Sequence, residues 1–371
     1  MGAHVRKRGS FWEYSVELGV DPVTNKRKRK AKSGFKTKKE CEKAMNELIN
    51  QINNNNYFEP EKIVFRNFAN QYLDEMKFAV REKTLERYDE IVNKHLIPYF
   101  GDLEMHKITS AHIHKFYETR LSDGNSSTTL KFYNNILTKI FSMAISNKVI
   151  KENPMVNVRR PKVARKDFNV WTVEQTNIFL DSVKDSSLYM LTLLAVTTGM
   201  RRGELCGLRW QNVNLDTGEI YVKEQLQEIN KEVKVCPPKT MISRRKIIML
   251  DYVIPILKEF KASQEEYLKN NNLKCDYVLQ TYKGEPCNPN LITKKFTSYA
   301  RRIMKELNLP VLRFHDLRHT HATQLLLAGV HPKIVADRLG HSSTTMTLEI
   351  YSHVIPSMQV SAAEKLNRLY T

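Results

Sequence analysis

Residues 197–205 read TTGMRRGEL, and this stretch constrains the fold of the C-terminal half of the 371-residue chain more than any other. Gly199 can adopt a backbone conformation that residues with a side chain avoid, so we expect it to place Arg201 at a helix start. Arg201 and Glu204 are three positions apart and therefore share one helix face. The stretch predicts an arginine and a carboxylate held together where a helix begins.

Three shorter motifs follow downstream. PKT, residues 238–240, lies between stretches of strand-like composition, which predicts a lysine in a hairpin. HDLR, residues 315–318, opens a helix whose later turns are apolar, and LGH, residues 339–341, is followed ten residues later by Tyr351. Taken singly, each motif has an ordinary structural explanation, such as a solvated cation, a helix cap or a core tyrosine.

The rest of the chain shows three zones of different pattern. In the first, residues 1–56, alternating side chains predict strands over 5–9, 11–18 and 26–32, and a capped helix over 37–52. The second, residues 64–161, carries apolar stripes typical of four helices, and the third, residues 167–371, mixes helices with a strand-rich stretch over 219–250. A basic run near residues 159–166 separates the last two zones.

These patterns predict a multidomain α+β chain. Its parts are a small three-stranded sheet with a helix, an all-α four-helix domain, and a mainly α domain with a small antiparallel sheet. The domain boundaries are expected at 1–56, 64–161 and 167–371, with a helix in the tail after residue 354.

Composition points to a polyanionic partner. Lysine and arginine number 59 against 40 acidic residues, giving a formal charge of +19, and nucleic acid is the commonest partner of such a chain. We found no apolar run long enough for a bilayer and no secretory signal, which favours the cytoplasm and no membrane partner. The 5 cysteines are scattered without a CxxC pair, so we expect no disulfide framework, metal site or cofactor.

The order of these motifs along the chain is more specific to one family than any single motif is. Arginine, then a hairpin lysine, then His-x-x-Arg, then Gly-His and a tyrosine near the C-terminus resembles the tyrosine recombinases, often called phage integrases. The resemblance covers the third zone almost fully. By layout, the first zone also resembles the arm-type DNA-binding domain of integrases from temperate phages and conjugative transposons. The second zone resembles their core-site-binding domain.

The resemblance implies a DNA strand transferase that integrates and excises a mobile element through a 3′-phosphotyrosyl intermediate, with no cofactor. Tyr351 is then the nucleophile, Lys239 is the general acid, and Glu204 orients Arg201 or a histidine. Paired guanidinium donors suit the charge of a phosphorane. The remaining catalytic residues implied are Arg201, Arg318, His315 as acceptor of the tyrosine proton, and His341 as a donor to a non-bridging oxygen.

The expected partners follow from the same resemblance and from the basic clusters. They are double-stranded DNA attachment sites, a homo-tetramer on DNA, an excision factor and a host DNA-bending protein. The basic residues expected to contact DNA are Arg6, Arg8, Lys26, Arg27, Lys28, Arg29, Lys30 and Lys131.

Several alternatives stay open at this point. The same scaffold could serve a type IB topoisomerase-like enzyme or a non-catalytic DNA-binding protein. The choice of histidine for the tyrosine proton, the packing of the tail on its own or a neighbouring subunit, and the kind of mobile element are not decided by the sequence.

Overall fold

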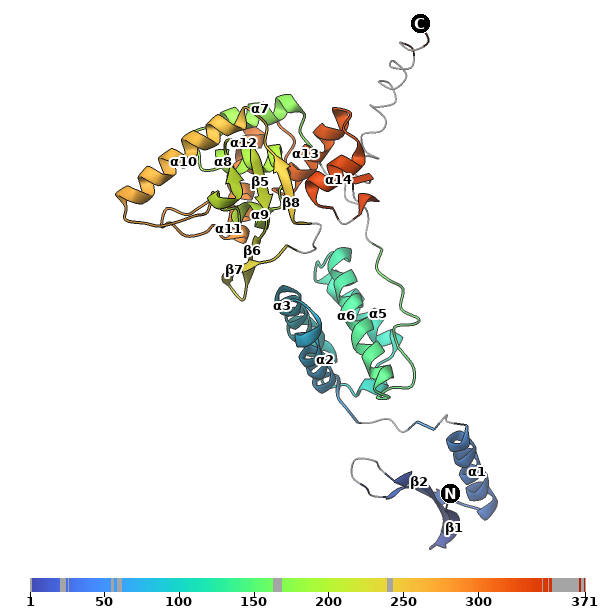
Figure 1. Ribbon diagram of the computed structural model, residues 1–371. Helices are drawn as coiled ribbons and strands as arrows, with labels where there is room; N and C mark the ends of the chain where they lie inside the picture. The colour runs from blue at the N-terminus through green and yellow to red at the C-terminus, as the bar shows by residue number, and fades with distance from the viewer. Residues whose placement is uncertain are drawn as a thin grey trace. The chain divides into compact units, whose positions relative to one another are not determined.

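The structure is a computed structural model, which describes residues 2–20, 25, 27–54, 57–58, 62–162, 169–238, 243–341, 343–345, 347–348, 367 and 370 (Figure 1). The chain divides into two compact units, residues 1–163 and 164–371. The predicted boundaries of three domains stay a prediction. Every helix among the described residues is too short or too polar to cross a membrane.

The N-terminal part of the first unit is a three-stranded antiparallel sheet covered by one helix. Strands β1 (Ala3–Arg8), β2 (Phe11–Val20) and β3 (Arg27–Phe35) pair in that order. Helix α1 (Lys38–Asn53) begins after Thr37, which forms the predicted capping box with Glu40. Tyr14 and Val16 of β2 are buried against this helix, so the alternation in β2 decides which face of the sheet is covered.

The remainder of the first unit is helical, as predicted. Its main helices are α2 (Phe65–Ala79), α3 (Glu82–Ile91), α5 (Ser110–Ser122) and α6 (Ser127–Ser146). After α3, the helical path continues through a π-helical turn, η1 (Val92–Leu96), into the short α4 (Ile97–Phe100). Pro98 lacks the N–H that would bond the carbonyl four residues earlier, which accounts for an irregular turn at this point.

The second unit has α8 (Tyr189–Thr198) at its centre, with nine of its residues buried. Around it lie α7 (Val173–Ser182), α9 (Arg202–Cys206), α10 (Val253–Asn270), α11 (Pro289–Lys295), α12 (Arg301–Glu306), α13 (Asp316–Leu327) and α14 (Pro332–Leu339). Because α8 is apolar on all sides, only a central position buries it fully. Helix α14 packs against β8 (Arg245–Ile248), and α13 packs against α8 and α14 (Figure 1).

The strands of the second unit form two small antiparallel sheets. Strands β4 (Val213–Asn214), β5 (Glu219–Val222) and β8 make one sheet, and β6 (Gln225–Ile229) pairs only with β7 (Glu232–Cys236) in the other. Asn230 and Lys231 both have positive φ angles, 52° and 67°, and close a tight β6–β7 hairpin. Strands β7 and β8 therefore belong to different sheets, and the predicted hairpin lysine between them, Lys239, lies outside the described residues.

Candidate active site

Gly199 and Arg201 have the local geometry predicted from the sequence. Gly199 has φ +64° and ends α8, and Arg201 is the N-cap residue of α9. The backbone N–H of Arg201 donates to Glu204 Oε2 at 2.8 Å, and its Nη1 donates to Glu204 Oε1 at 2.9 Å. The predicted pair of arginine and carboxylate at a helix start is thus present.

Glu204 is a buried carboxylate, with 2% of the residue exposed. Its second partner is Arg245, whose Nη1 and Nη2 donate to the two carboxylate oxygens at 3.1 and 2.9 Å. Burial acts to raise the pKa of Glu204, but hydrogen bonds and charges from Arg245 and Arg201 together hold it below its usual range. Glu204 is therefore an ionised group that two guanidinium groups share.

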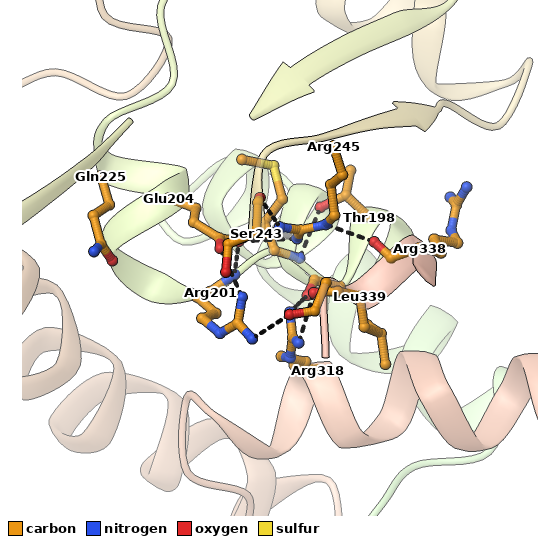
Figure 2. Close-up of polar contacts among 12 residues, drawn as sticks. Thr198, Arg201, Glu204, Gln225, Ser243, Arg245, Arg318, Arg338 and Leu339 are labelled. Carbon is orange, nitrogen blue, oxygen red and sulfur yellow. Dashed lines mark hydrogen bonds and ion pairs between the residues drawn. The ribbon is translucent and has the colours of Figure 1, made fainter. Parts of the chain in front are cut away.

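Arg318 is brought to the same place from a distant part of the chain (Figure 2). It is 4% exposed, and it donates to the carbonyls of Gly199 at 2.7 Å and Leu339 at 2.8 Å. Arg201 Nη2 donates to the next carbonyl, that of Gly340, at 2.8 Å. Burial and the charge of Arg201 lower the pKa of Arg318 to about 9, which leaves it cationic at neutral pH. Two arginines therefore meet at the end of α14.

The two predicted histidines, His315 and His341, come before and after Arg318 in the sequence. His341 follows Gly340, is 8% exposed, and its Nδ1 lies 2.8 Å from Thr347 Oγ1. Burial and the nearby arginines lower the pKa of His341 to about 3, so it is neutral. His315 precedes α13, its ring packs edge-on against that of His319 with 5.0 Å between the ring centroids, and desolvation together with His319 and Arg318 lowers its pKa to about 4.

His321 of α13 is a packing residue. It is buried, its Nδ1 donates to the Val196 carbonyl at 2.7 Å, and its Nε2 accepts from Arg338 Nε at 3.1 Å. Both ring nitrogens are thereby used in joining α13 to α8 and α14. Within the described part of the chain, no group of three or more His, Cys, Asp or Glu residues could hold a metal ion.

Three predicted site residues, Lys26, Lys239 and Tyr351, lie outside the described residues, as does nearly all of the tail after residue 354. The roles of Lys239 and Tyr351 therefore stay predictions.

Arg245 is the residue that sequence reasoning missed. It stands in the run Arg244-Arg245-Lys246, a few residues after the PKT motif, and no role was predicted for it. A signal was available, because Arg245 and Ile247 are two positions apart in a strand and therefore share one face, and Ile247 is fully buried. Lys246 lies on the opposite, exposed face, where it pairs with Glu219.

The basic residues of the N-terminal sheet divide between its two faces, as the alternation predicted. Arg6 lies opposite Glu13, and Arg29 lies opposite Glu17, on the face away from α1. Arg6 donates to Glu13 at 2.7 Å, Arg8 donates to the same carboxylate at 3.5 Å, and Arg29 Nη2 donates to Glu17 at 3.0 Å. Three other residues of this sheet were predicted to bind DNA: Arg27, which is exposed and 3.8 Å from Glu17; Lys28, which is exposed; and Lys30, which is half-buried opposite Val16. Lys131, also predicted to bind DNA, is exposed near the start of α6.

Comparisons with known proteins agree with this arrangement over the whole chain. A profile of the Phage integrase family matches residues 170–358, one of the Phage integrase, N-terminal SAM-like domain matches residues 64–120, and one of the Arm DNA-binding domain matches residues 4–52. The ICEBs1 integrase of Bacillus subtilis (strain 168) is 27% identical over 363 residues, which are 96% of this chain and 97% of that protein. A "Tyrosine recombinase XerC-like" protein of Caldanaerobacter subterraneus is 28% identical over 99% of this chain and 98% of its own length.

Solved structures share the fold. The Tn1549 transposon integrase in complex with transposon right end DNA superposes with a TM-score of 0.68 at 21% identity, over 83% of this chain and 100% of that one. A lambda integrase tetramer bound to a Holliday junction gives a TM-score of 0.58 at 19% identity, over 94% of each chain. The expected multidomain α+β architecture is thereby confirmed. With its Arg201–Glu204–Arg318 cluster and the family profile over its C-terminal half, the chain belongs to the phage integrase family and is a tyrosine recombinase, an enzyme that transfers DNA strands.

Proposed function

We propose that this recombinase cleaves each DNA strand with Tyr351 as the nucleophile. The Tyr351 oxygen attacks phosphorus, the bond from phosphorus to the 5′-oxygen breaks, and a 3′-phosphotyrosyl bond forms. The tyrosine proton passes to His315, and the leaving 5′-oxygen takes a proton from Lys239. Rejoining reverses these steps with a different 5′-hydroxyl, so the bond energy is conserved and no cofactor is needed.

The observation that carries this proposal is the meeting of Arg201 and Arg318 at the end of α14. Each guanidinium donates to one backbone carbonyl at that helix end, Arg318 donates also to the Gly199 carbonyl at the end of α8, and both have more N–H donors than these bonds use. Two fixed cations with spare donors suit the extra negative charge of a pentacoordinate phosphorane. Neutral His341 beside them is available as a hydrogen-bond donor to a non-bridging oxygen.

A suicide substrate tests the nucleophile. It is a nicked duplex of a candidate attachment site, from which a short 5′-hydroxyl fragment diffuses away after cleavage and leaves the covalent adduct. We expect the adduct to map to Tyr351 by mass spectrometry, and Tyr351→Phe to bind the duplex but to form none. Tyr370→Phe is the matched control, because Tyr370 is also near the C-terminus and is 88% exposed. An adduct on another residue would overturn the assignment.

We also propose that the N-terminal sheet binds DNA through the face that carries Arg6, Arg8 and Arg29. Three observations support this: the face lies opposite the one that α1 covers, it carries several arginines, and it lies in a region that matches an arm DNA-binding domain. Strands are also known to read DNA from within the major groove. In this proposal the active form is a homo-tetramer on double-stranded attachment sites, and an excision factor and a host DNA-bending protein set the direction.

A further inference from the structure

Arg245 opens β8, the strand that follows the segment with Lys239, and its side chain is 5% exposed. Besides its two bonds to Glu204, its Nε donates to the Arg338 carbonyl at 2.6 Å, and its Nη1 donates to the Ser243 carbonyl at 3.1 Å. Figure 2 shows the guanidinium between Glu204 and the end of α14. Arg245 thus connects β8, the start of α9 and the end of α14.

The carboxylate that Arg245 contacts is also the one that holds Arg201. A buried carboxylate is costly unless cations and donors compensate its charge. If Arg201 turned its donors toward a phosphate, Glu204 would lose part of that compensation. The fork of Arg245, which reaches both oxygens of Glu204, would maintain it. Arg201 can then serve the phosphate without leaving a buried charge unpaired.

The turn before His341 is fitted to the same side chain. Gly340 has φ +68°, and a Cβ atom added there would lie 3.1 Å from both Cδ and Nη1 of Arg245. The backbone at Gly340 therefore lies directly against the guanidinium, and the bond to the Arg338 carbonyl fixes the residue two positions earlier. The position of His341 depends on this contact.

We propose that Arg245 is a positioning residue for DNA cleavage, which acts by holding Glu204, and through it Arg201, together with the turn that carries His341. The inference rests on the proposed function. It connects β8, the strand after Lys239, to Arg201 through the shared carboxylate of Glu204. Arg245 itself does not contact the reacting atoms.

Single-turnover cleavage of the suicide substrate, at saturating protein, tests the proposal in the full chain. We expect Arg245→Gln to lower the cleavage rate by about tenfold to a hundredfold, which is less than the roughly hundredfold to thousandfold cost of removing a charge-stabilising donor, because Arg201 is misplaced but still present. Its dissociation constant for the duplex should change by less than about twofold, because phosphate contacts spread over the whole chain dominate affinity. Arg245→Lys should cleave at an intermediate rate. An ammonium group keeps the charge, but it lacks the planar fork that bonds Glu204 and the carbonyls of Ser243 and Arg338 at the same time.

Arg338→Gln is the matched control. Arg338 makes a similar set of bonds, to His321 and to the carbonyls of Thr197 and Ile248, but its side chain does not contact Glu204. It should lower the melting temperature without lowering the cleavage rate per folded molecule. If Arg245→Gln behaves in the same way, Arg245 is structural only and the inference is wrong. Should Arg245→Gln fail to fold, the cleavage rate of Arg245→Lys decides the question. A rate below that of the wild-type protein supports the inference, and a rate equal to it overturns the inference.

A double-mutant cycle with Glu204→Gln separates positioning from general stabilisation. If Arg245 acts through Glu204, then Arg245→Gln should cost less than about threefold in the Glu204→Gln background, because contacting residues are not additive. Independent effects that multiply would contradict the proposed route. A wild-type protein that forms no adduct would refute the proposed function itself, whereas normal cleavage by Arg245→Gln would refute only this inference.

Discussion

Gly199→Ala should destabilise the C-terminal unit strongly, because the site leaves no room for a side chain. Gly199 has φ +64°, and a Cβ atom there would lie 2.6 Å from His321 Cδ2 and 2.6 Å from Leu339 Cδ2. His321 is 5% exposed and Leu339 is fully buried, so neither neighbour can move into solvent. The substitution therefore combines a strained backbone with an overpacked core.

The matched control for this change is Gly329→Ala. Gly329 has φ +82°, and its added Cβ would meet nothing within 4 Å, so it reports the backbone strain alone. That strain costs about 1–2 kcal/mol for a residue with a side chain. Overpacking adds about 1–3 kcal/mol, so we expect a total loss of roughly 2–5 kcal/mol for Gly199→Ala. If the free energy of unfolding falls by about 3 kcal/mol per molar urea, the urea concentration at the unfolding midpoint should fall by roughly 0.7–1.7 M.

Urea unfolding followed by tryptophan emission measures this difference. The chain has 3 tryptophans, and Trp12→Phe would leave Trp171 and Trp210 in the C-terminal unit as the only reporters. Trp171 is 1% exposed, so its emission should shift when that unit unfolds. A midpoint for Gly199→Ala equal to or above that of Gly329→Ala would refute the steric argument.

Two further predictions concern protonation and DNA binding. The C-terminal unit should lose stability as the pH falls through about 6.5 and on toward the folded values, since His321 and His341, with pKa values lowered to about 3, are neutral when folded and protonated when unfolded. Urea midpoints from pH 8 to pH 4 measure this loss, and His321→Gln should flatten the curve; a midpoint independent of pH would contradict it. Glu13→Gln should release Arg6 and Arg8 and so strengthen non-specific DNA binding, with a steeper dependence on salt. Fluorescence anisotropy between 50 and 200 mM salt, about the range over which such binding changes most, measures the slope, and an unchanged slope would show that these arginines do not face DNA.

The parts of the site that could be predicted are those encoded by short spacing. Arg201 and Glu204 are three residues apart, and a helix start brings any such pair together whatever surrounds it. The bond from Arg318 to the Gly199 carbonyl joins residues 119 positions apart, and that from Arg245 to Glu204 joins residues 41 apart. Periodicity contains no information on contacts of this kind, so only the family resemblance linked Arg318 to Arg201.

Strand pairing limited the prediction in a second way. The strand-rich stretch over 219–250 was identified correctly, but its division into two sheets depends on which strands exchange hydrogen bonds. Asn230-Lys231 forms the tight turn, although it lacks the glycine that usually marks a two-residue hairpin. Because the sequence does not show which strands pair, no role was predicted for Arg245, which follows the PKT motif and begins β8.

The end of α14 explains why three arginines can gather in one place. Arg245, Arg318 and Arg201 donate to three consecutive carbonyls, those of Arg338, Leu339 and Gly340. The last carbonyls of a helix lack partners within the helix and form the negative end of its dipole. Gly340 ends α14 in the left-handed conformation, which exposes these carbonyls to the incoming side chains. With the buried Glu204 charge, the helix end offsets the repulsion among the three cations, so the positive site is assembled by the fold before any phosphate arrives.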